Sequence, residues 1–192
     1  MNGFGECHEG IVDDKKRSVG LLLVADIPYR NPRRTVILQR RGEFNQEKDW
    51  LPESWPGICQ LTVHGRLREC EDTTEGLERE VREELGECFA NALKKFIKTK
   101  RSMTTLNSLY NSKESVVNFG IRIDQTLLDK IRLHPSSGGL ILLTGDQLAS
   151  VRVLDPSKFD KKLGVFERNA IVMWPEELQA VKFAFVDRAI NS

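Results

Sequence analysis

The sequence lacks a long hydrophobic run, so no stretch of it is apolar enough to span a membrane. Its first ten residues, MNGFGECHEG, lack the basic stretch followed by an apolar run that a secretory signal needs. Charge of one sign is not in excess either, because 29 Lys and Arg face 28 Asp and Glu. A net charge of +1 gives no electrostatic reason to bind a nucleic-acid polymer. We therefore expect a cytoplasmic protein whose partner is a small molecule rather than a membrane or a nucleic acid.

Cysteine is scarce, and its spacing excludes the usual zinc and redox motifs. The four cysteines, Cys7, Cys59, Cys70 and Cys88, contain no Cys-x-x-Cys pair. Cys7 precedes His8, but two adjacent residues without a second pair nearby more often have a structural role than bind a metal. We expect reduced thiols that are mostly buried.

The composition is that of a soluble globular domain, with 40% hydrophobic and 30% charged residues. A chain of 192 residues can bury one good core and is short for two. The polar, glycine-containing start predicts a flexible arm over residues 1–16, followed by a single domain over residues 17–192.

Strands and helices alternate irregularly along the chain. Runs rich in leucine and β-branched residues predict strands at 18–25, 35–39, 58–64, 115–123 and 139–144. Helical spacing of apolar residues predicts helices at 73–86, 89–97 and 127–131, and a last helix that begins at Pro175. A long loop is expected over residues 40–57. This order predicts a mixed sheet between helices.

The predicted helix over residues 73–86 has clear ends. Asp72 and Glu75 have the spacing of an N-terminal capping box, and Gly86 is placed to end the helix. A narrow apolar stripe along the helix would face the core. It consists of Leu77, Val81, Leu85 and, beyond the glycine, Cys88.

Four glutamates crowd onto another face of this helix, at positions i, i+3, i+4 and i+7. They are Glu80, Glu83, Glu84 and Glu87. Like charges at this spacing cost about a few tenths of a kcal/mol each. Glu83, Glu84 and Glu87 also lie at the negative end of the helix dipole, which disfavours anions by roughly 0.3–1 kcal/mol. One explanation is a solvated acidic face relieved by Arg79 and Arg82. The other is a bound Mg²⁺ or Mn²⁺, which prefers oxygen ligands, whereas zinc would favour Cys or His.

The segment from residue 65 to 87 resembles a known family motif, the Nudix box. This motif has a glycine, five residues, a glutamate, seven residues and then Arg-Glu-hydrophobic-x-Glu-Glu-x-Gly-hydrophobic. The matching residues are Gly65, Glu71, Arg79, Glu80, Val81, Glu83, Glu84 and Gly86. Glu87 stands where the motif has an apolar residue, whose packing we expect Cys88 to take over. His64 stands where many members have a second glycine, which affects how the loop approaches a phosphate.

The resemblance to the Nudix hydrolases, the MutT-like hydrolases of nucleoside diphosphate-linked compounds, implies an α/β/α sandwich with a mixed β-sheet. It also implies that Glu80, Glu83 and Glu84 hold Mg²⁺, for which Mn²⁺ can substitute, and that the carbonyl oxygen of Gly65 adds a ligand.

The same resemblance implies roles for the neighbouring residues and a reaction. Arg79 would orient the glutamates, and Glu71 would support the loop. The reaction would be Mg²⁺-dependent hydrolysis of a phosphoanhydride bond in a nucleotide or nucleoside diphosphate derivative. The identity of the general base stays open among a box glutamate, Glu114 and Glu167.

The substrate stays open as well, because the markers of particular Nudix subgroups are missing from residues 102–105, SMTT, where they usually stand. In the loop before the box, Trp50 or Trp55 could stack on a base, and Arg40 and Arg41 could contact phosphate. Packing of the tryptophans and a solvated strand end for the arginines are the competing interpretations. Whether the chain forms a homo-oligomer is also left open.

Three other functions compete with the hydrolase. An isoprenoid diphosphate isomerase of Nudix type should have a catalytic cysteine before the box, where only Cys59 stands. A catalytically silent nucleotide sensor would more often have lost a box glutamate. A purely structural acidic helix would not need Gly65 and Glu71 at the family spacing.

Overall fold

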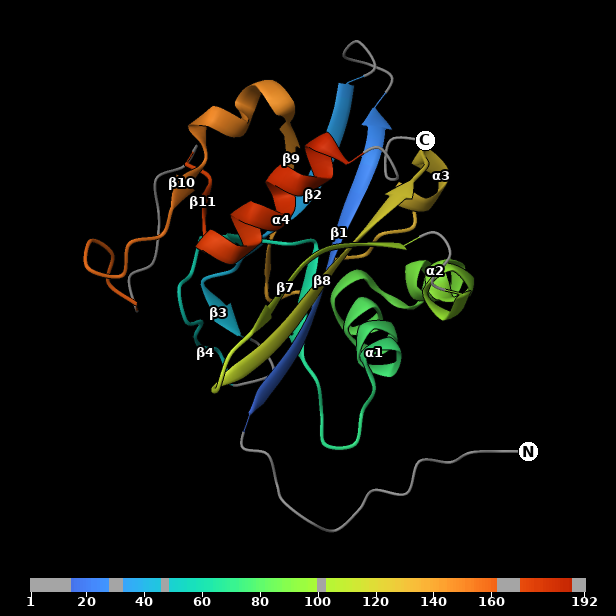
Figure 1. The fold of residues 1–192 in the computed structure, drawn as a ribbon, viewed down its shortest axis with the longest axis horizontal. Coiled ribbons are helices and arrows are strands. Elements are labelled where there is room, and N and C mark those ends of the chain that lie inside the picture. The colour runs from blue at the N-terminus through green and yellow to red at the C-terminus, as the bar shows by residue number, and fades with distance from the viewer. Residues whose placement is uncertain (1–14, 28–32, 46–48, 100–102, 162–169, 188–192) are drawn as a thin grey trace.

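A mixed sheet of seven strands forms the centre of the structure (Figure 1). The computed structural model describes residues 15–27, 33–45, 49–99, 103–161 and 170–187. The strands of the sheet are β1 (Lys16–Ile27), β2 (Arg33–Arg41), β5 (Cys59–Gln60), β6 (Val63–Arg66), β7 (Met103–Tyr110), β8 (Glu114–Ile123) and β9 (Ser137–Thr144). β1 and β8 are parallel, whereas β1–β2, β7–β8 and β2–β9 are antiparallel. The predicted mixed sheet is confirmed, and β7 is a strand that the sequence patterns did not indicate.

β1 changes its partner midway along its length. Its second half pairs with β2 from Leu23 onwards, and its first half pairs with β6 up to Leu21. The fully buried Thr62 lies where the two pairings diverge. Its hydroxyl accepts a hydrogen bond from the backbone N–H of Leu23 at 2.9 Å and donates one to the carbonyl oxygen of Ile37. The single strand predicted over residues 58–64 is therefore two strands, β5 on β2 and β6 on β1.

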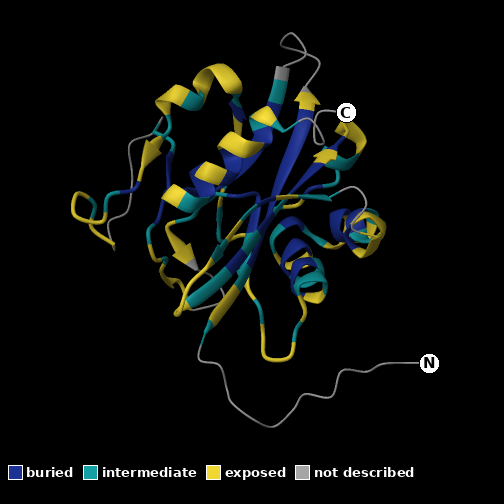
Figure 2. Cartoon of the chain, viewed as in Figure 1, coloured by how far each residue is buried: buried dark blue, intermediate teal, exposed yellow. Residues whose placement is uncertain are grey.

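Helices cover both faces of the sheet. α1 (Thr73–Leu85) and α2 (Glu87–Thr99) lie on one face, and α4 (Pro175–Val186) lies on the other (Figure 1). Alternate residues of β1 serve the two cores, because side chains along a strand point to opposite faces. Leu21 and Leu23 pack with α1 and α2, and Leu22 and Val24 pack with α4. Figure 2 shows the buried strands between the exposed outer faces of the helices. This arrangement is the predicted α/β/α sandwich.

The ends of α1 agree with the prediction. The Asp72 side chain accepts hydrogen bonds from the backbone N–H groups of Thr74 and Glu75, and the Glu75 side chain accepts from the N–H of Asp72. Gly86 follows the helix with φ +89°, a left-handed conformation that favours glycine. Phe89, not the exposed Cys88, fills the core beyond this glycine, so the packing expected of Cys88 is wrong.

Shorter elements complete the structure. β3 (Phe44–Asn45) and β4 (Leu51–Pro52) form a small hairpin within the segment that was predicted to be a loop. β10 (Arg152–Val153) and β11 (Val172–Met173) form a parallel pair, and η3 (Gly145–Ser150) is a 3₁₀ helix. The predicted short helix is α3 (Gln125–Leu128), which begins earlier than expected because Asp124 caps it.

The cysteines differ in state. Cys59 is a buried free thiol, and Cys88 is an exposed free thiol. Cys70 takes part in a disulfide bond, so the expectation of reduced thiols is wrong at this position. Cys7 and His8 lie outside the described residues, as does most of the predicted arm. No helix in the described ranges combines the length and the apolar character needed to cross a membrane.

Candidate active site

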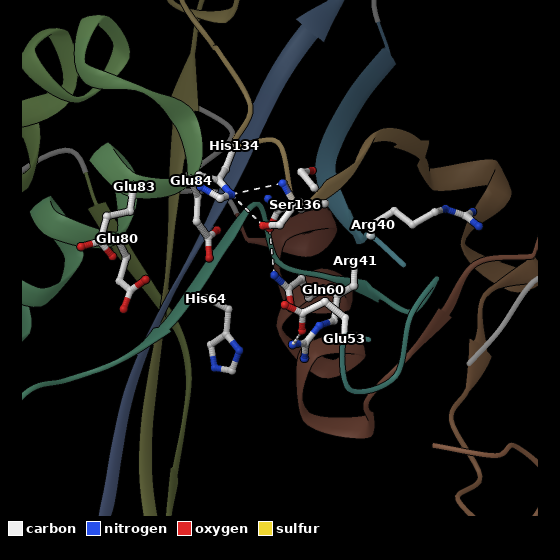
Figure 3. Close-up of a pocket in the computed structure, with 13 residues that line it drawn as sticks. Arg40, Arg41, Glu53, Gln60, His64, Glu80, Glu83, Glu84, His134 and Ser136 are labelled. Atoms are coloured by element: carbon white, nitrogen blue, oxygen red, sulfur yellow. Dashed lines mark hydrogen bonds and ion pairs between the residues drawn. The ribbon is translucent and has the colours of Figure 1, made fainter. Parts of the chain in front are cut away.

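A polar pocket with a volume of about 240 Å³ lies beside the C-terminal half of α1 (Figure 3). Its residues come from α1, from the ends of β2, β5 and β6, from the loop before β9 and from the segment after β4. They are Gln39, Arg40, Arg41, Gly42, Glu53, Gln60, His64, Glu80, Glu83, Glu84, His134, Ser136 and Ser137. None of these side chains is a hydrocarbon or carries an aromatic ring other than imidazole. The pocket therefore suits a charged, strongly hydrogen-bonding ligand.

Arg79 connects the acidic residues at the edge of this pocket. Its guanidinium binds both carboxylate oxygens of Glu71, with Nε–Oε1 and Nη2–Oε2 distances of 2.8 Å. It also donates to Glu80 at 2.7 Å, to Glu83 at 3.0 Å and to the carbonyl oxygen of Arg66 at 2.8 Å. The two-point bond from Arg79 lowers the pKa of Glu71 to about 2. Arg79 thus joins the loop before α1 to two glutamates of the helix.

The Glu80 carboxylate lies against the backbone of β6. Glu80 is buried, and a Cβ atom at Gly65 would overlap both of its carboxylate oxygens. Burial raises the pKa of Glu80, although the bond from Arg79 opposes this effect. Gly65 is therefore the residue that allows helix and strand to approach this closely.

Of the three glutamates, Glu84 is the one with a buried carboxylate oxygen, Oε2, that lacks a hydrogen-bond partner among the described residues. Burial, reinforced by the charge of Glu80, raises the pKa of Glu84 well above its ordinary value, while the backbone N–H of His64 lowers it. An unpaired buried oxygen of this kind costs about 1–3 kcal/mol.

This chemistry fits a hard divalent cation, because the donors are carboxylate oxygens and one of them is buried without a partner. The residues are not already arranged as a cage: in the described part of the chain, no three acidic, histidine or cysteine side chains are close enough to hold a metal together. Arg79 accounts for this, since it holds Glu80 and Glu83 itself. Glu83 is also half-exposed and pairs with Arg68 at 3.0 Å.

Solved structures share this three-layer architecture. The NUDIX domain of Shewanella oneidensis NrtR, solved in complex with ADP ribose, matches 88% of this chain and 86% of its own, with a TM-score of 0.51 and 12% sequence identity. The chain has the Nudix fold.

Other MutT/Nudix proteins match less closely in shape. The MutT protein of Methanosarcina mazei matches 91% of this chain and 96% of its own, with a TM-score of 0.47 and 13% identity. A MutT/nudix family protein of Enterococcus faecalis matches 68% of this chain and 44% of its own, with a TM-score of 0.48 and 13% identity. This chain therefore spans less than half of that protein. No protein-family model matches the sequence, and a comparison with curated proteins gives no match.

Within this Nudix fold the box residues form one strand–loop–helix unit, from the end of β6 through α1. Gly65 and Glu80 are in contact, and Arg79 binds Glu71, Glu80 and Glu83. Glu87, at the position where the box has an apolar residue, is exposed and pairs with Arg82 at 2.7 Å.

Two of the three residues expected to contact substrate line the pocket of the Nudix fold. Arg40 donates to the carbonyl oxygen of Ala170 at 3.1 Å, and Arg41 pairs with Glu53 at 2.8 Å. Trp55 is not among the lining residues. It packs edge-on against Trp174, with ring centroids 5.6 Å apart, which is the competing packing role.

The pocket also contains residues that the sequence patterns did not single out. Gln39 and Gln60 are joined by a 2.8 Å hydrogen bond between their side chains. Each lies next to an apolar stretch of a predicted strand, TVIL before Gln39 and IC before Gln60, which is a signal that sequence reasoning could have used. His134 lies in the loop before β9, where the sequence carries no such signal. Of the suggested bases outside the box, Glu114 does not line the pocket, and Glu167 lies outside the described residues.

Proposed function

We propose that this protein is a Mg²⁺-dependent hydrolase of the Nudix family that cleaves a phosphoanhydride bond in a nucleotide or nucleoside diphosphate derivative. The observation that carries the proposal is the unpartnered, buried Oε2 of Glu84, beside two further box glutamates in a polar pocket. The family assignment rests on this site and on the match to the Nudix box, and the shared fold supports it.

Three side chains and one backbone group would hold the cation: Glu80, Glu83, Glu84 and the carbonyl oxygen of Gly65. Bound Mg²⁺, or Mn²⁺ in its place, supplies the positive charge that stabilises the diphosphate oxygens as the bond breaks. Arg79 keeps Glu80 and Glu83 in position and links them to the loop through Glu71. The carboxylates are therefore already in position when a substrate enters, and no side-chain rearrangement is needed to bring them together.

The reaction itself is the attack of water on a phosphorus atom, with cleavage of the bond to the bridging oxygen. The proton of the water passes to a base, and the bridging oxygen leaves with its electron pair as a phosphate group. Arg41 lies in the pocket opposite the glutamates and provides a cation for the substrate phosphates (Figure 3). Among the described residues, the only rings in the lining are the imidazoles of His64 and His134, so this lining suits the diphosphate part of the substrate.

The ligand class is supported by the nature of ADP ribose, with which the NrtR domain was solved, since this compound is a nucleoside diphosphate derivative. The isomerase alternative is weakened by Cys59. Its thiol is buried, its pKa is raised by burial, and it does not line the pocket. A silent nucleotide-binding sensor is the second outcome that an experiment must distinguish.

The test is release of phosphate or nucleotide from a panel of nucleoside triphosphates, nucleotide sugars, dinucleotides and dinucleoside polyphosphates, with Mg²⁺, with Mn²⁺ and with EDTA. We expect metal-dependent cleavage of at least one compound and a loss of on the order of 10²-fold in Glu84→Gln and Glu80→Gln, by analogy with the removal of one fixed electrostatic group. Glu87→Gln is the matched control and should keep full activity, because Glu87 is the exposed first residue of α2 and not, as its spacing predicted, part of the acidic face of α1. Binding without cleavage would support the sensor, and near-full activity of folded Glu84→Gln would contradict the site.

A further inference from the structure

A histidine of the pocket is paired with a carboxyl group from the opposite side of the sheet. His64 lies in β6, immediately before Gly65, and its imidazole lines the pocket with 31% of the side chain exposed. Glu177 lies in the first turn of α4 and exposes only 4% of its side chain. His64 Nδ1 and Glu177 Oε1 are 3.5 Å apart, which is longer than an ordinary N–H···O hydrogen bond but within ion-pair distance.

Glu177 is an acidic residue buried among apolar side chains. Its neighbours in α4, Leu178 and Val181, are buried with the apolar residues of β1 and β2. Its second oxygen, Oε2, is buried without a hydrogen-bond partner in the part of the chain that the structure describes. Burial of a polar group without a partner costs stability. The carboxyl accepts a hydrogen bond from the backbone N–H of Leu61, and the His64 imidazole is the ring that lies beside it.

The groups around Glu177 favour a carboxyl that carries its proton. Burial and the nearby charge of Glu176 raise the pKa of Glu177 to about 8, against the weaker opposing effects of Arg41 and the Leu61 backbone N–H. A protonated carboxyl can donate to Nδ1, and the imidazole then keeps its own hydrogen on Nε2. The nitrogen turned away from Glu177 is thus a hydrogen-bond donor.

The strand next to His64 carries no side chain at the position opposite its ring. His64 is opposite Gly20 in the register of β1 and β6, and Gly20 has no side chain. Two strands further on, the same row holds Asn118, whose Oδ1 lies where a Cβ of Gly20 would be. Glu177 is the carboxyl group that the structure places beside the ring, 3.5 Å from Nδ1.

We propose that His64 contacts a phosphate oxygen of the substrate through Nε2 and that Glu177 is the positioning residue that orients the imidazole. This inference rests on the proposed function, because it concerns the same pocket. His64 is well placed for the contact, since its backbone N–H lies against the Glu84 carboxylate while its side chain extends into the pocket (Figure 3). The pair gives the site a neutral donor opposite its acidic face.

The first test is steady-state kinetics with the diphosphate substrate that the panel identifies. His64→Phe keeps a ring of similar size but has no donor, so KM should rise about tenfold with little change in kcat, as expected for a contact made equally in the ground state and the transition state. Glu177→Leu should raise KM similarly, and Glu177→Gln, whose amide can still donate to Nδ1, should restore it to within about twofold of the native value. Lys182→Gln, on the exposed face of α4, is the control on the same helix and should change neither constant. An unchanged KM in folded His64→Phe would overturn the contact.

The second test needs no catalysis and separates the two proposals. The ¹⁵N signals of the His64 imidazole, assigned by their loss in His64→Phe, should show hydrogen on Nε2 in the native protein and in Glu177→Gln, and rapid tautomer exchange in Glu177→Leu. Inorganic pyrophosphate with Mg²⁺ should shift these signals and should bind His64→Phe about tenfold more weakly by calorimetry. Equal affinity, no binding, or signals unaffected by Glu177→Leu would overturn the inference. Pyrophosphate binding through His64 without cleavage of any panel compound would overturn only the hydrolase.

Discussion

The Glu80 carboxylate fills the space that any side chain at residue 65 would need, so only a glycine fits there. Gly65 is held in the β1–β6 pairing opposite Val19, so its backbone cannot move aside without loss of sheet hydrogen bonds. The requirement for glycine here is therefore steric. A conformational requirement for glycine would need a positive φ, and Gly65 is not among the described residues that have one.

Gly65→Ala should displace the Glu80 carboxylate, because the side chain is the more movable of the two groups. We expect activity to fall by on the order of 10²-fold, comparable to the loss of a fixed electrostatic group, while the free energy of unfolding falls by no more than about 1 kcal/mol. Phosphate release and denaturant unfolding are the measurements. Gly145→Ala is the control, since a Cβ there would meet its nearest atom, in Phe185, at an ordinary 3.6 Å. Full activity in Gly65→Ala would show that the position of Glu80 is not critical.

Glu84→Gln should stabilise the protein in EDTA while it lowers activity. The folded protein buries the Glu84 carboxylate and raises its pKa, whereas the unfolded chain does not. The ionised form is therefore favoured by unfolding, and the gain from the substitution should be absent below the ordinary pKa near 4.5 and grow as pH rises above it. We expect about 1–3 kcal/mol at pH 7.

Saturating Mg²⁺ should reduce or reverse this gain, because a ligand at 100 times its dissociation constant stabilises the native protein by about 2.7 kcal/mol. Denaturant unfolding of both proteins, with EDTA and with Mg²⁺ at several pH values, measures the effect. A gain that does not depend on Mg²⁺ would argue against Glu84 as a metal ligand.

Glu71→Gln should destabilise the loop before α1, because it weakens the two-point bond with Arg79. Glu71 has its pKa lowered to about 2 in the folded protein. Its contribution is therefore fully present above about pH 4.5 and is lost as pH falls towards 2. We expect a difference on the order of 2 kcal/mol at pH 7 that shrinks over this acidic range. Acid unfolding of native protein, Glu71→Gln and the exposed-loop control Glu69→Gln tests this, and a constant difference between pH 5 and 2 would refute it.

Thr62→Val should destabilise the point where β1 changes partner. The substitution keeps the shape of the side chain but leaves the backbone N–H of Leu23 and the carbonyl oxygen of Ile37 buried without the hydroxyl between them. We expect a loss of about 2–3 kcal/mol. Thr62→Ser retains the hydroxyl and should lose less. Denaturant unfolding and hydrogen exchange of the Leu23 amide measure the two effects, and equal losses in both variants would assign the role of Thr62 to its methyl group.

Local signals in the sequence predicted the parts of the structure that are stabilised locally. The α1 helix is one example, since Asp72, Glu75 and Gly86 determine its ends within the segment itself. Long apolar strands such as β8 are another. The box residues could be brought together from sequence because most of them lie on one helix, where their spacing fixes their geometry.

Features that depend on contacts between distant segments could not be predicted in this way. β7 has polar residues such as Thr105 and Asn107 and becomes a strand by pairing with β8 at the edge of the sheet. The break at Thr62 depends on the backbones of β1 and β2. Glu177 has the sequence context of an ordinary helix start, and only the packing of α4 against the sheet places it beside His64.

Arg79 gives the acidic face of α1 a counter-ion of its own. Because the guanidinium already bonds Glu80 and Glu83, the helix can fold with its carboxylates partly neutralised before any metal arrives. A cation that binds there must compete with an internal one. Under the proposed function, metal binding would replace one positive charge with another. The metal affinity would then depend on how much more strongly the glutamates bind the metal than they bind Arg79. Weaker bonds from Arg79 would raise the metal affinity and leave the metal-free site less ordered.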